Sequence, residues 1–107
     1  MTRAKSEILQ ELPFLHQLIN MAKRYIDPDK IVIFGSRARG DHSQRSDVDI
    51  GFYLARNDHP NWSRFVLDAE DELKTLLEMD LVDVTSASED LKKSIMTEGV
   101  VIYEKKK

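Results

Sequence analysis

The sequence contains no cysteine and no long apolar run, and these two absences exclude several classes of protein. Without cysteine the chain can form no disulfide framework, and it offers neither a thiolate nucleophile nor a cysteine ligand for a metal. The first residues lack the apolar core of a signal peptide, and no apolar run approaches the roughly 20 residues that span a bilayer. We therefore expect a cytoplasmic protein.

An excess of basic residues is also missing, since the formal net charge is −3. This balance disfavours a protein that coats nucleic acid through a broad basic face. The P-loop pattern G-x-x-x-x-G-K-[ST] is absent, because Gly40 is followed by Asp41. What remains is a chain of 107 residues, 41% of them hydrophobic, which predicts a single globular domain over residues 1–107.

Hydrophobic periodicity predicts helices that alternate with short strands. The expected strands cover residues 31–34, 47–54, 81–85 and 100–103, the first buried on both faces and the last at an edge of the sheet. The expected helices cover residues 8–26, 36–40, 62–77 and 88–96, with a kink or a restart of the first one at Pro13. The predicted fold class is α/β (α+β), a small mixed sheet of about four strands flanked by helices.

Two aspartates stand at the start of the second predicted strand. Asp47 and Asp49 alternate with apolar residues, so both side chains leave the same face, about 7 Å apart along the chain. Their like charges should raise one of the two pKa values unless a cation lies beside them. Mg²⁺ prefers hard oxygen ligands and typically takes one or two carboxylates together with substrate phosphates. A bare D-x-D is more often a solvated loop, so the neighbouring residues decide between the two interpretations.

Three neighbouring features favour a site for phosphate and metal. Gly35 and Ser36 follow a buried strand, where glycine lets the backbone approach a ligand and serine adds a hydroxyl. Among the arginines that follow this turn, Arg39 is the preferred candidate for contacting the ligand or bracing the loop. Asp83 lies in the apolar third strand and would complete a carboxylate triad if that strand lay beside the second. Asp80 is the weaker rival, because a turn acid is ordinary where a strand begins.

Taken together, "FGSRARGDHSQRSDVDIGFYL" and the later "LVDVTS" resemble the nucleotidyltransferase superfamily pattern of G-S, a spacer, D-x-D and a third acid on a later strand. The A-R-G after the serine, the S-D-x-D spacing and the short length most resemble the minimal nucleotidyltransferases. These proteins are the antitoxin partners of HEPN-domain toxins. The resemblance covers about residues 5–104 of this chain.

The resemblance implies a nucleotidyltransferase fold and an enzyme that transfers AMP from ATP to a hydroxyl, a tyrosine, of a cognate HEPN toxin, which neutralises the toxin. It implies that Gly35 and Ser36 hold the nucleotide phosphates. Asp47, Asp49 and Asp83 would bind two Mg²⁺ ions, with Asp83 also orienting or deprotonating the acceptor hydroxyl. The expected partners are therefore ATP and the toxin, in a hetero-oligomer, and direct binding of nucleic acid is not expected.

Two alternatives stay open at the level of the sequence. The chain could be a non-catalytic antitoxin that neutralises its partner by covering it, with the apolar stripe of the N-terminal helix as the interface. It could also be a transferase that acts on a small molecule or an RNA end, although the modest negative charge counts against RNA. The mass of the partner after incubation with ATP and Mg²⁺ separates the enzyme from the binder, since only transfer adds AMP.

Overall fold

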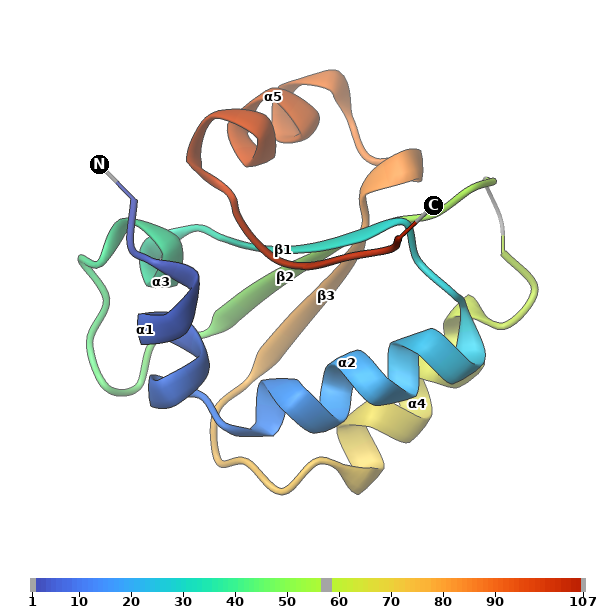
Figure 1. Ribbon diagram of the computed structural model, residues 1–107, viewed down its shortest axis with the longest axis horizontal. Coiled ribbons are helices and arrows are strands. Elements are labelled where there is room, and N and C mark those ends of the chain that lie inside the picture. Colours follow the sequence, from blue (N-terminus) through green and yellow to red (C-terminus); the bar gives the residue numbers. More distant parts are fainter. Residues whose placement is uncertain (1, 57–58, 107) are drawn as a thin grey trace.

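The computed structural model describes residues 2–56 and 59–106, so part of the predicted loop at 55–61 lies outside the described residues. Helices and strands alternate along the described chain much as the sequence predicts (Figure 1). The α-helices are α1 (Lys5–Glu11), α2 (Phe14–Tyr25), α3 (Ser36–Arg39), α4 (Trp62–Glu72) and α5 (Glu89–Glu98). The strands are β1 (Lys30–Phe34), β2 (Val48–Tyr53), β3 (Met79–Asp83) and β4 (Val100–Glu104), and a 3-10 turn, η1 (Val84–Ser86), follows β3.

The strands form one mixed sheet in the order β3-β2-β1-β4. β1 is antiparallel to both β2 and β4, whereas β2 and β3 are parallel. The predicted mixed sheet flanked by helices is therefore confirmed, and β4 lies at an edge as expected. β1 is central and its last four residues are buried, which agrees with the prediction of a strand covered on both faces.

Helices cover both faces of the sheet (Figure 1). α2 and α4 lie under one face, and α5 with η1 lies over the other, while α1 and α3 sit together at one end. The first helical stretch restarts at Pro13, which is the N-cap residue of α2 and needs no backbone donor there. The sheet therefore has one face packed by long helices and one face that is only partly covered.

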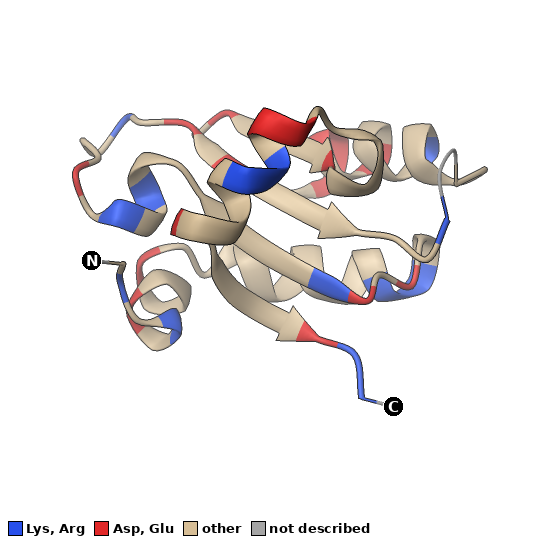
Figure 2. Ribbon diagram, turned by 90° about the horizontal axis from the view of Figure 1, so that it is seen from above, with Lys and Arg blue, Asp and Glu red and all other residues tan. Residues whose placement is uncertain are grey.

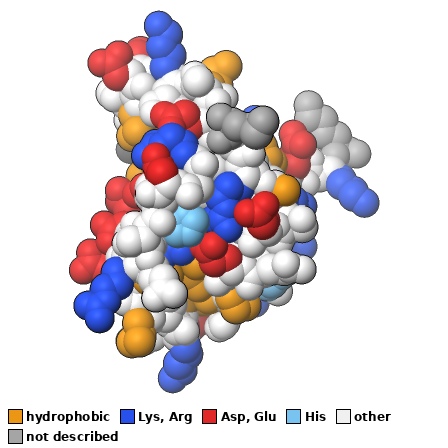
Figure 3. Space-filling model, turned by 90° about the vertical axis from the view of Figure 1, so that its left-hand side faces the viewer, with side chains coloured by type: hydrophobic (Ala, Val, Ile, Leu, Met, Phe, Trp, Pro, Cys, Tyr) orange, Lys and Arg blue, Asp and Glu red, His pale blue; other side chains and the backbone are white. Residues whose placement is uncertain are grey.

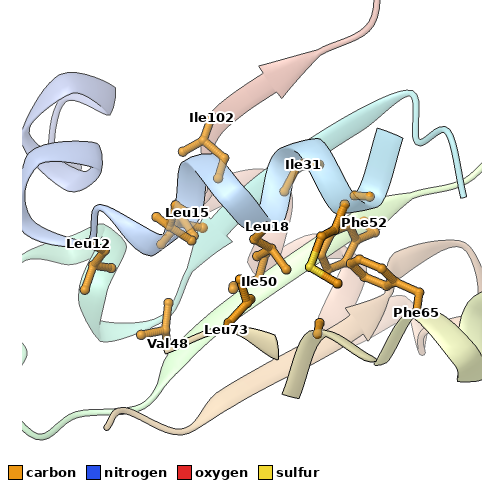
Figure 4. Packing of buried hydrophobic residues seen from close by; sticks show 14 of the residues in the cluster. Leu12, Leu15, Leu18, Ile31, Val48, Ile50, Phe52, Phe65, Leu73 and Ile102 are labelled. Atoms are coloured by element: carbon orange, nitrogen blue, oxygen red, sulfur yellow. The ribbon is translucent and has the colours of Figure 1, made fainter. Parts of the chain in front are cut away.

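The main hydrophobic core lies between the sheet and helices α2 and α4 (Figure 4). Phe52 of β2 packs edge-on against Phe65 of α4, with ring centroids 5.2 Å apart. Leu15 and Leu18 of α2 have no exposed surface. Burying a side chain of this size stabilises a fold by about 1.5–3 kcal/mol. The apolar stripe of the N-terminal helices is thus buried in the core. This corrects the suggestion that the stripe forms an interface with a partner.

A smaller apolar cluster packs on the opposite face of the sheet, under α5. Its buried members are Val32, Phe34, Val84 and Ile95. Phe34 ends β1, so this cluster stops where the chain turns into α3. Beyond the cluster the same sheet face carries Asp49 of β2 and Asp80 of β3, because alternate residues of a strand share a face.

Two elements near the third strand have bounds that differ from the prediction. α4 ends at Glu72 rather than at residue 77, and Leu76 is fully exposed. β3 begins at Met79 and ends at Asp83, two residues before the prediction at either end. The cause is parallel pairing with β2, which begins when the Val48 N–H donates to the Glu78 carbonyl at 2.9 Å. This pairing brings Asp80 inside the strand, although the apolar pair Leu81-Val82 begins only after it.

Candidate active site

Asp49 lies against the turn that follows the central strand. It is the pairing partner of Phe34, the last residue of β1, and Gly35 comes next along the chain. Gly35 has φ +71° and ψ −153°, a conformation that is essentially restricted to glycine. A Cβ atom at this position would lie 2.3 Å from Oδ2 of Asp49. The structure therefore brings the predicted glycine-serine turn and the D-x-D pair together, and glycine is what allows the close approach.

The third acid at this place is Asp80, not Asp83. In the parallel pairing of β2 and β3, Asp80 lies opposite Asp49, whereas Asp83 lies opposite Phe52. Residues opposite each other in a sheet share a face, so Asp80 shares the face of Asp49 and also of Asp47, two residues before it.

Asp83 is an odd number of residues beyond Asp80 and leaves the other face of the strand. Its carboxylate accepts hydrogen bonds from the Thr85 N–H at 3.0 Å and from Ser86 Oγ at 3.1 Å. Asp83 thus closes the η1 turn. The expectation that it converges with Asp47 and Asp49 is corrected by this register.

The electrostatics of the site centre on Asp49. Burial, and then the negative charges of Asp80 and Asp47, raise the pKa of the Asp49 carboxyl above its usual value, and nearby Arg39 opposes this shift. Asp49 is half-buried, while Asp47 is exposed. The predicted like-charge effect is therefore seen, with burial as its larger cause. Each of these effects disfavours the ionised form and would be relieved by a cation.

Ser36 and Arg39 are the first and last residues of α3, which borders the acids. Gly35 takes the N-cap position before Ser36 in this short helix. Arg39 is 43% exposed and donates to Asp41 Oδ2 at 3.1 Å and to Glu98 Oε2 at 2.7 Å. Arg39 therefore ties α3 to α5 beside the acids.

Two residues of this region were missed by the reasoning from sequence. The sequence places Asp80 behind Asp83, because apolar content predicts a strand that begins after Asp80. The sequence favours Arg39 as the functional arginine, yet Arg37 is 2% exposed and its guanidinium contacts the segment that leads into Asp47. A repeat of acids in "DLVD" was the available signal for Asp80, whereas no pattern in the sequence marks Arg37 as buried.

The donor set fits a hard divalent cation that is shared with a nucleotide. In the described ranges 2–56 and 59–106, no group of three His, Cys, Asp or Glu side chains is arranged to hold a metal ion as it stands. A site completed by substrate phosphates needs only one or two carboxylates. Asp47 and Asp49 supply these, and the glycine at position 35 leaves the Asp49 carboxylate accessible from the turn.

A cavity of about 850 Å³ lies elsewhere on the same face of the sheet. It is bounded by α5, η1 and the ends of β1, β2 and β4, and its lining includes Lys30, Tyr53, Lys92 and Met96. The ammonium of Lys30 lies 4.7 Å from the centre of the Tyr53 ring. None of the acids described above lines this cavity, so it is separate from the carboxylate site.

The family model described as polymerase beta, nucleotidyltransferase matches residues 16–107. Comparison with curated proteins finds no match. None of the described helices is long and apolar enough to cross a membrane.

Several solved structures that share this fold are toxin–antitoxin complexes. One is a toxin–antitoxin with AMP-PNP, at 26% identity over 85% of this chain and 73% of that chain, with a TM-score of 0.69. A second is a complex of a tri-AMPylated Shewanella oneidensis HEPN toxin with MNT antitoxin, at 24% identity over 89% and 73% of the two chains, with a TM-score of 0.66. A third, the toxin–antitoxin MntA-HepT, is 23% identical over 87% and 72%, with a TM-score of 0.65.

The second and third of these likenesses establish a shared fold, while the family model reaches from residue 16 to residue 107 and so covers well over half of the sequence. The resemblance drawn from the glycine-serine turn and the D-x-D pair is thereby confirmed. The protein belongs to the polymerase beta type of nucleotidyltransferase family and is a nucleotidyltransferase.

Proposed function

We propose that this nucleotidyltransferase transfers AMP from ATP to a hydroxyl, a tyrosine, of a HEPN-domain toxin and thereby neutralises the toxin. The structures it resembles support this proposal, since one contains AMP-PNP and another contains an AMPylated HEPN toxin. The structural observation behind the proposed chemistry is that Asp49 lies opposite Asp80 and against the Gly35 turn. It supplies carboxylates and a close backbone approach at one point of the sheet.

Magnesium would be held by Asp47 and Asp49 together with phosphate oxygens of ATP, and when bound it offsets the negative charge of the triphosphate. Gly35 and Ser36 would hold the phosphates through backbone N–H groups and the serine hydroxyl. Arg39, which stands beside the acids, would contact the nucleotide or keep α3 and α5 in place around it.

Asp80 replaces Asp83 as the third acid of this proposal. Its carboxylate would orient the acceptor hydroxyl and accept its proton. The bond from the acceptor oxygen to the α-phosphorus then forms as the bond from that phosphorus to pyrophosphate breaks, and pyrophosphate leaves. Most of the rate gain would come from positioning and from electrostatic stabilisation by the surrounding groups.

The partner can reach this site because its acids lie at the surface of a partly covered sheet face. Asp47 and Asp80 are both exposed. The view in Figure 2 looks onto α5, the helix above this face, and shows acidic and basic residues interspersed on it. A protein that presents a tyrosine could therefore approach the carboxylates without passing through the core.

The direct test is the mass of a purified partner. The chain is incubated with a candidate cognate HEPN-domain protein, ATP and Mg²⁺, and the mass of the partner is measured by intact mass spectrometry. The proposal expects mass gains of whole AMP units that need Mg²⁺ and disappear with Asp49→Asn. An unchanged mass together with full neutralisation would instead support a binding antitoxin, and AMP found on a small molecule or RNA would assign a different acceptor.

A further inference from the structure

Arg37 is a buried charged side chain with 2% of its surface exposed, and it carries the only formal charge in the set of fully buried residues among those the structure describes. It is the second residue of the short helix α3, between the glycine-serine turn and the D-x-D pair. A guanidinium removed from water is unfavourable unless acceptors surround it. Its acceptors therefore indicate what the side chain holds in place.

The guanidinium of Arg37 joins two segments that are distant in the sequence. Its Nη1 donates to Glu11 Oε1 in α1 at 2.5 Å. Its Nη2 donates to the backbone carbonyls of Gln44 at 3.2 Å and Ser46 at 3.0 Å. Ser46 is followed directly by Asp47. Arg37 therefore bonds to the loop immediately before the first acid of the pair.

Glu11 is itself held by a cluster of charged groups. Arg3 Nη2 donates to its Oε2 at 2.7 Å, and His42 Nε2 lies 3.0 Å from its Oε1. A second nitrogen of Arg3 donates to the Arg37 carbonyl at 3.1 Å. Figure 3 shows this end of the molecule, where side chains of both charges gather around a histidine. The carboxylate of Glu11 is thus a fixed counter-ion for Arg37.

Asp47 needs such support because strand pairing does not fix it. β2 begins at Val48, and Asp47 is exposed at the end of a polar loop. Inside that loop, Ser43 and Ser46 bond to each other through Ser43 N–H to Ser46 Oγ at 2.9 Å. Ordering backbone costs about 1–2 kcal/mol per residue, and an ion site needs its ligands in fixed places.

We propose that Arg37 is a positioning residue for the carboxylate pair: it fixes the backbone at Gln44 and Ser46, and so sets where the Asp47 carboxylate lies, with Glu11 as its counter-ion. This inference rests on the proposed function, because it assigns a role within the same site. Glu11 lies outside residues 16–107, which the family model matches. The counter-ion is therefore supplied by the segment that precedes the matched region.

The test compares Arg37→Gln, Arg37→Lys and Glu11→Gln with the control Arg45→Gln. Arg45 is exposed in the same loop, so the control removes the same charge without removing a buried contact. Amide hydrogen exchange of residues 44–48 is measured without nucleotide, and Mn²⁺ affinity is measured on the chain alone. The kcat and the KM for ATP are then measured with the partner protein present.

In Arg37→Gln we expect the amides of residues 44–48 to exchange about tenfold faster or more, because the loop loses its anchoring hydrogen bonds. Mn²⁺ affinity should fall by about tenfold and kcat by about 10- to 100-fold, with a smaller change in KM, since a displaced ligand harms the reaction geometry. Arg37→Lys should lie between Gln and wild type, because an ammonium keeps the charge but cannot serve acceptors in fork geometry. Arg45→Gln should match wild type in loop exchange.

Wild-type exchange of residues 44–48 in a folded Arg37→Gln protein would overturn the inference, and so would unchanged Mn²⁺ affinity. If Arg37→Gln does not fold, Glu11→Gln is judged by the same two measurements and against the same limits. A wild-type protein that transfers no AMP would overturn the proposed function alone, because exchange and Mn²⁺ affinity are measured without transfer.

Discussion

Asp49 and Asp80 lie opposite each other on neighbouring parallel strands, with both carboxylates on the same face of the sheet. Like charges directly opposite each other destabilise a sheet, and partial burial of Asp49 adds to this cost. The strand nevertheless stays in register because its other face is anchored in the core by Val48, Ile50 and Phe52, none of which has exposed surface. Apolar packing thus holds the acids in an arrangement that they would not adopt by themselves.

The first prediction concerns Asp49→Asn without metal. Removing a half-buried charge that faces two other acids should leave the free energy of unfolding unchanged or raise it by about 0.2–1 kcal/mol. The same variant should lose Mg²⁺-dependent binding of ATP. Urea denaturation in EDTA and calorimetry with ATP measure the two effects, and Asp71→Asn on the exposed side of α4 is the matched control. A clear loss of stability in EDTA would contradict the electrostatic argument.

The second prediction separates Asp80 from Asp83. Asp80→Asn should lower the rate of AMP transfer by about 10²–10⁴-fold, the usual contribution of a general base, and leave folding intact. Asp83→Asn should keep the transfer rate but lower the free energy of unfolding by about 0.5–2 kcal/mol, since the η1 turn loses charge-assisted hydrogen bonds. Transfer assays and denaturation curves on both variants test this prediction. Loss of transfer in Asp83→Asn together with normal transfer in Asp80→Asn would show that the register argument is wrong.

The third prediction is that Gly35→Ala damages the site more than Gly40→Ala does. Both glycines have positive φ, +71° and +93°, so each substitution should cost about 1–3 kcal/mol of stability. Only the Cβ at residue 35 would meet Asp49, whereas the Cβ at residue 40 would meet the Arg3 side chain at 3.3 Å. Binding of ATP with Mg²⁺ should therefore be lost in Gly35→Ala and kept in Gly40→Ala. Equal binding by the two folded variants would argue against a functional turn.

The fourth prediction is a dependence of stability on pH through Glu11. Hydrogen bonds from Arg3, and then from Arg37, lower the pKa of the Glu11 carboxyl to about 2. Because the folded-state pKa lies below the ordinary 4.5, the ionised group stabilises the fold above that pH, and this contribution is lost as the pH falls towards 2.

Glu11→Gln should therefore lower the free energy of unfolding at neutral pH by about 1–3 kcal/mol, because Arg37 stays buried without its counter-ion. The variant should also lose less stability than wild type between about pH 5 and about pH 2. Urea denaturation at several pH values measures both effects. If the free energy of unfolding of Glu11→Gln falls as steeply with acid as that of wild type, Glu11 is not the group that causes the pH dependence.

The outline of the fold could be predicted because its signals are local. The alternation of Val48, Ile50 and Phe52 with Asp47 and Asp49 indicates a strand with one apolar and one acidic face, and the structure has this strand. The Gly35 turn and the edge position of the last strand were predicted from equally local patterns. These features follow from short-range sterics and from the burial of apolar residues, which a single sequence displays.

The third acid and the loop anchor could not be predicted because they depend on register and burial. The pairing register of β3 against β2 places Asp80 opposite Asp49 and Asp83 opposite Phe52, whereas apolar content alone favoured a strand that starts after Asp80. Arg37 and Arg39 look alike in "SRARG", yet α3 turns one of them inward and leaves the other 43% exposed. Only packing against α1 distinguishes them.

The ion pair between Glu11 and Arg37 bears on how the protein can be shortened. A version trimmed to the matched region would begin at residue 16 and would keep every aspartate of the site. It would lack α1, however, and with it the buried Ile8 and the anion that Arg37 requires. Trimming at that boundary would therefore keep all the chemical groups of the site but remove the carboxylate that neutralises the arginine bonded to the loop before Asp47.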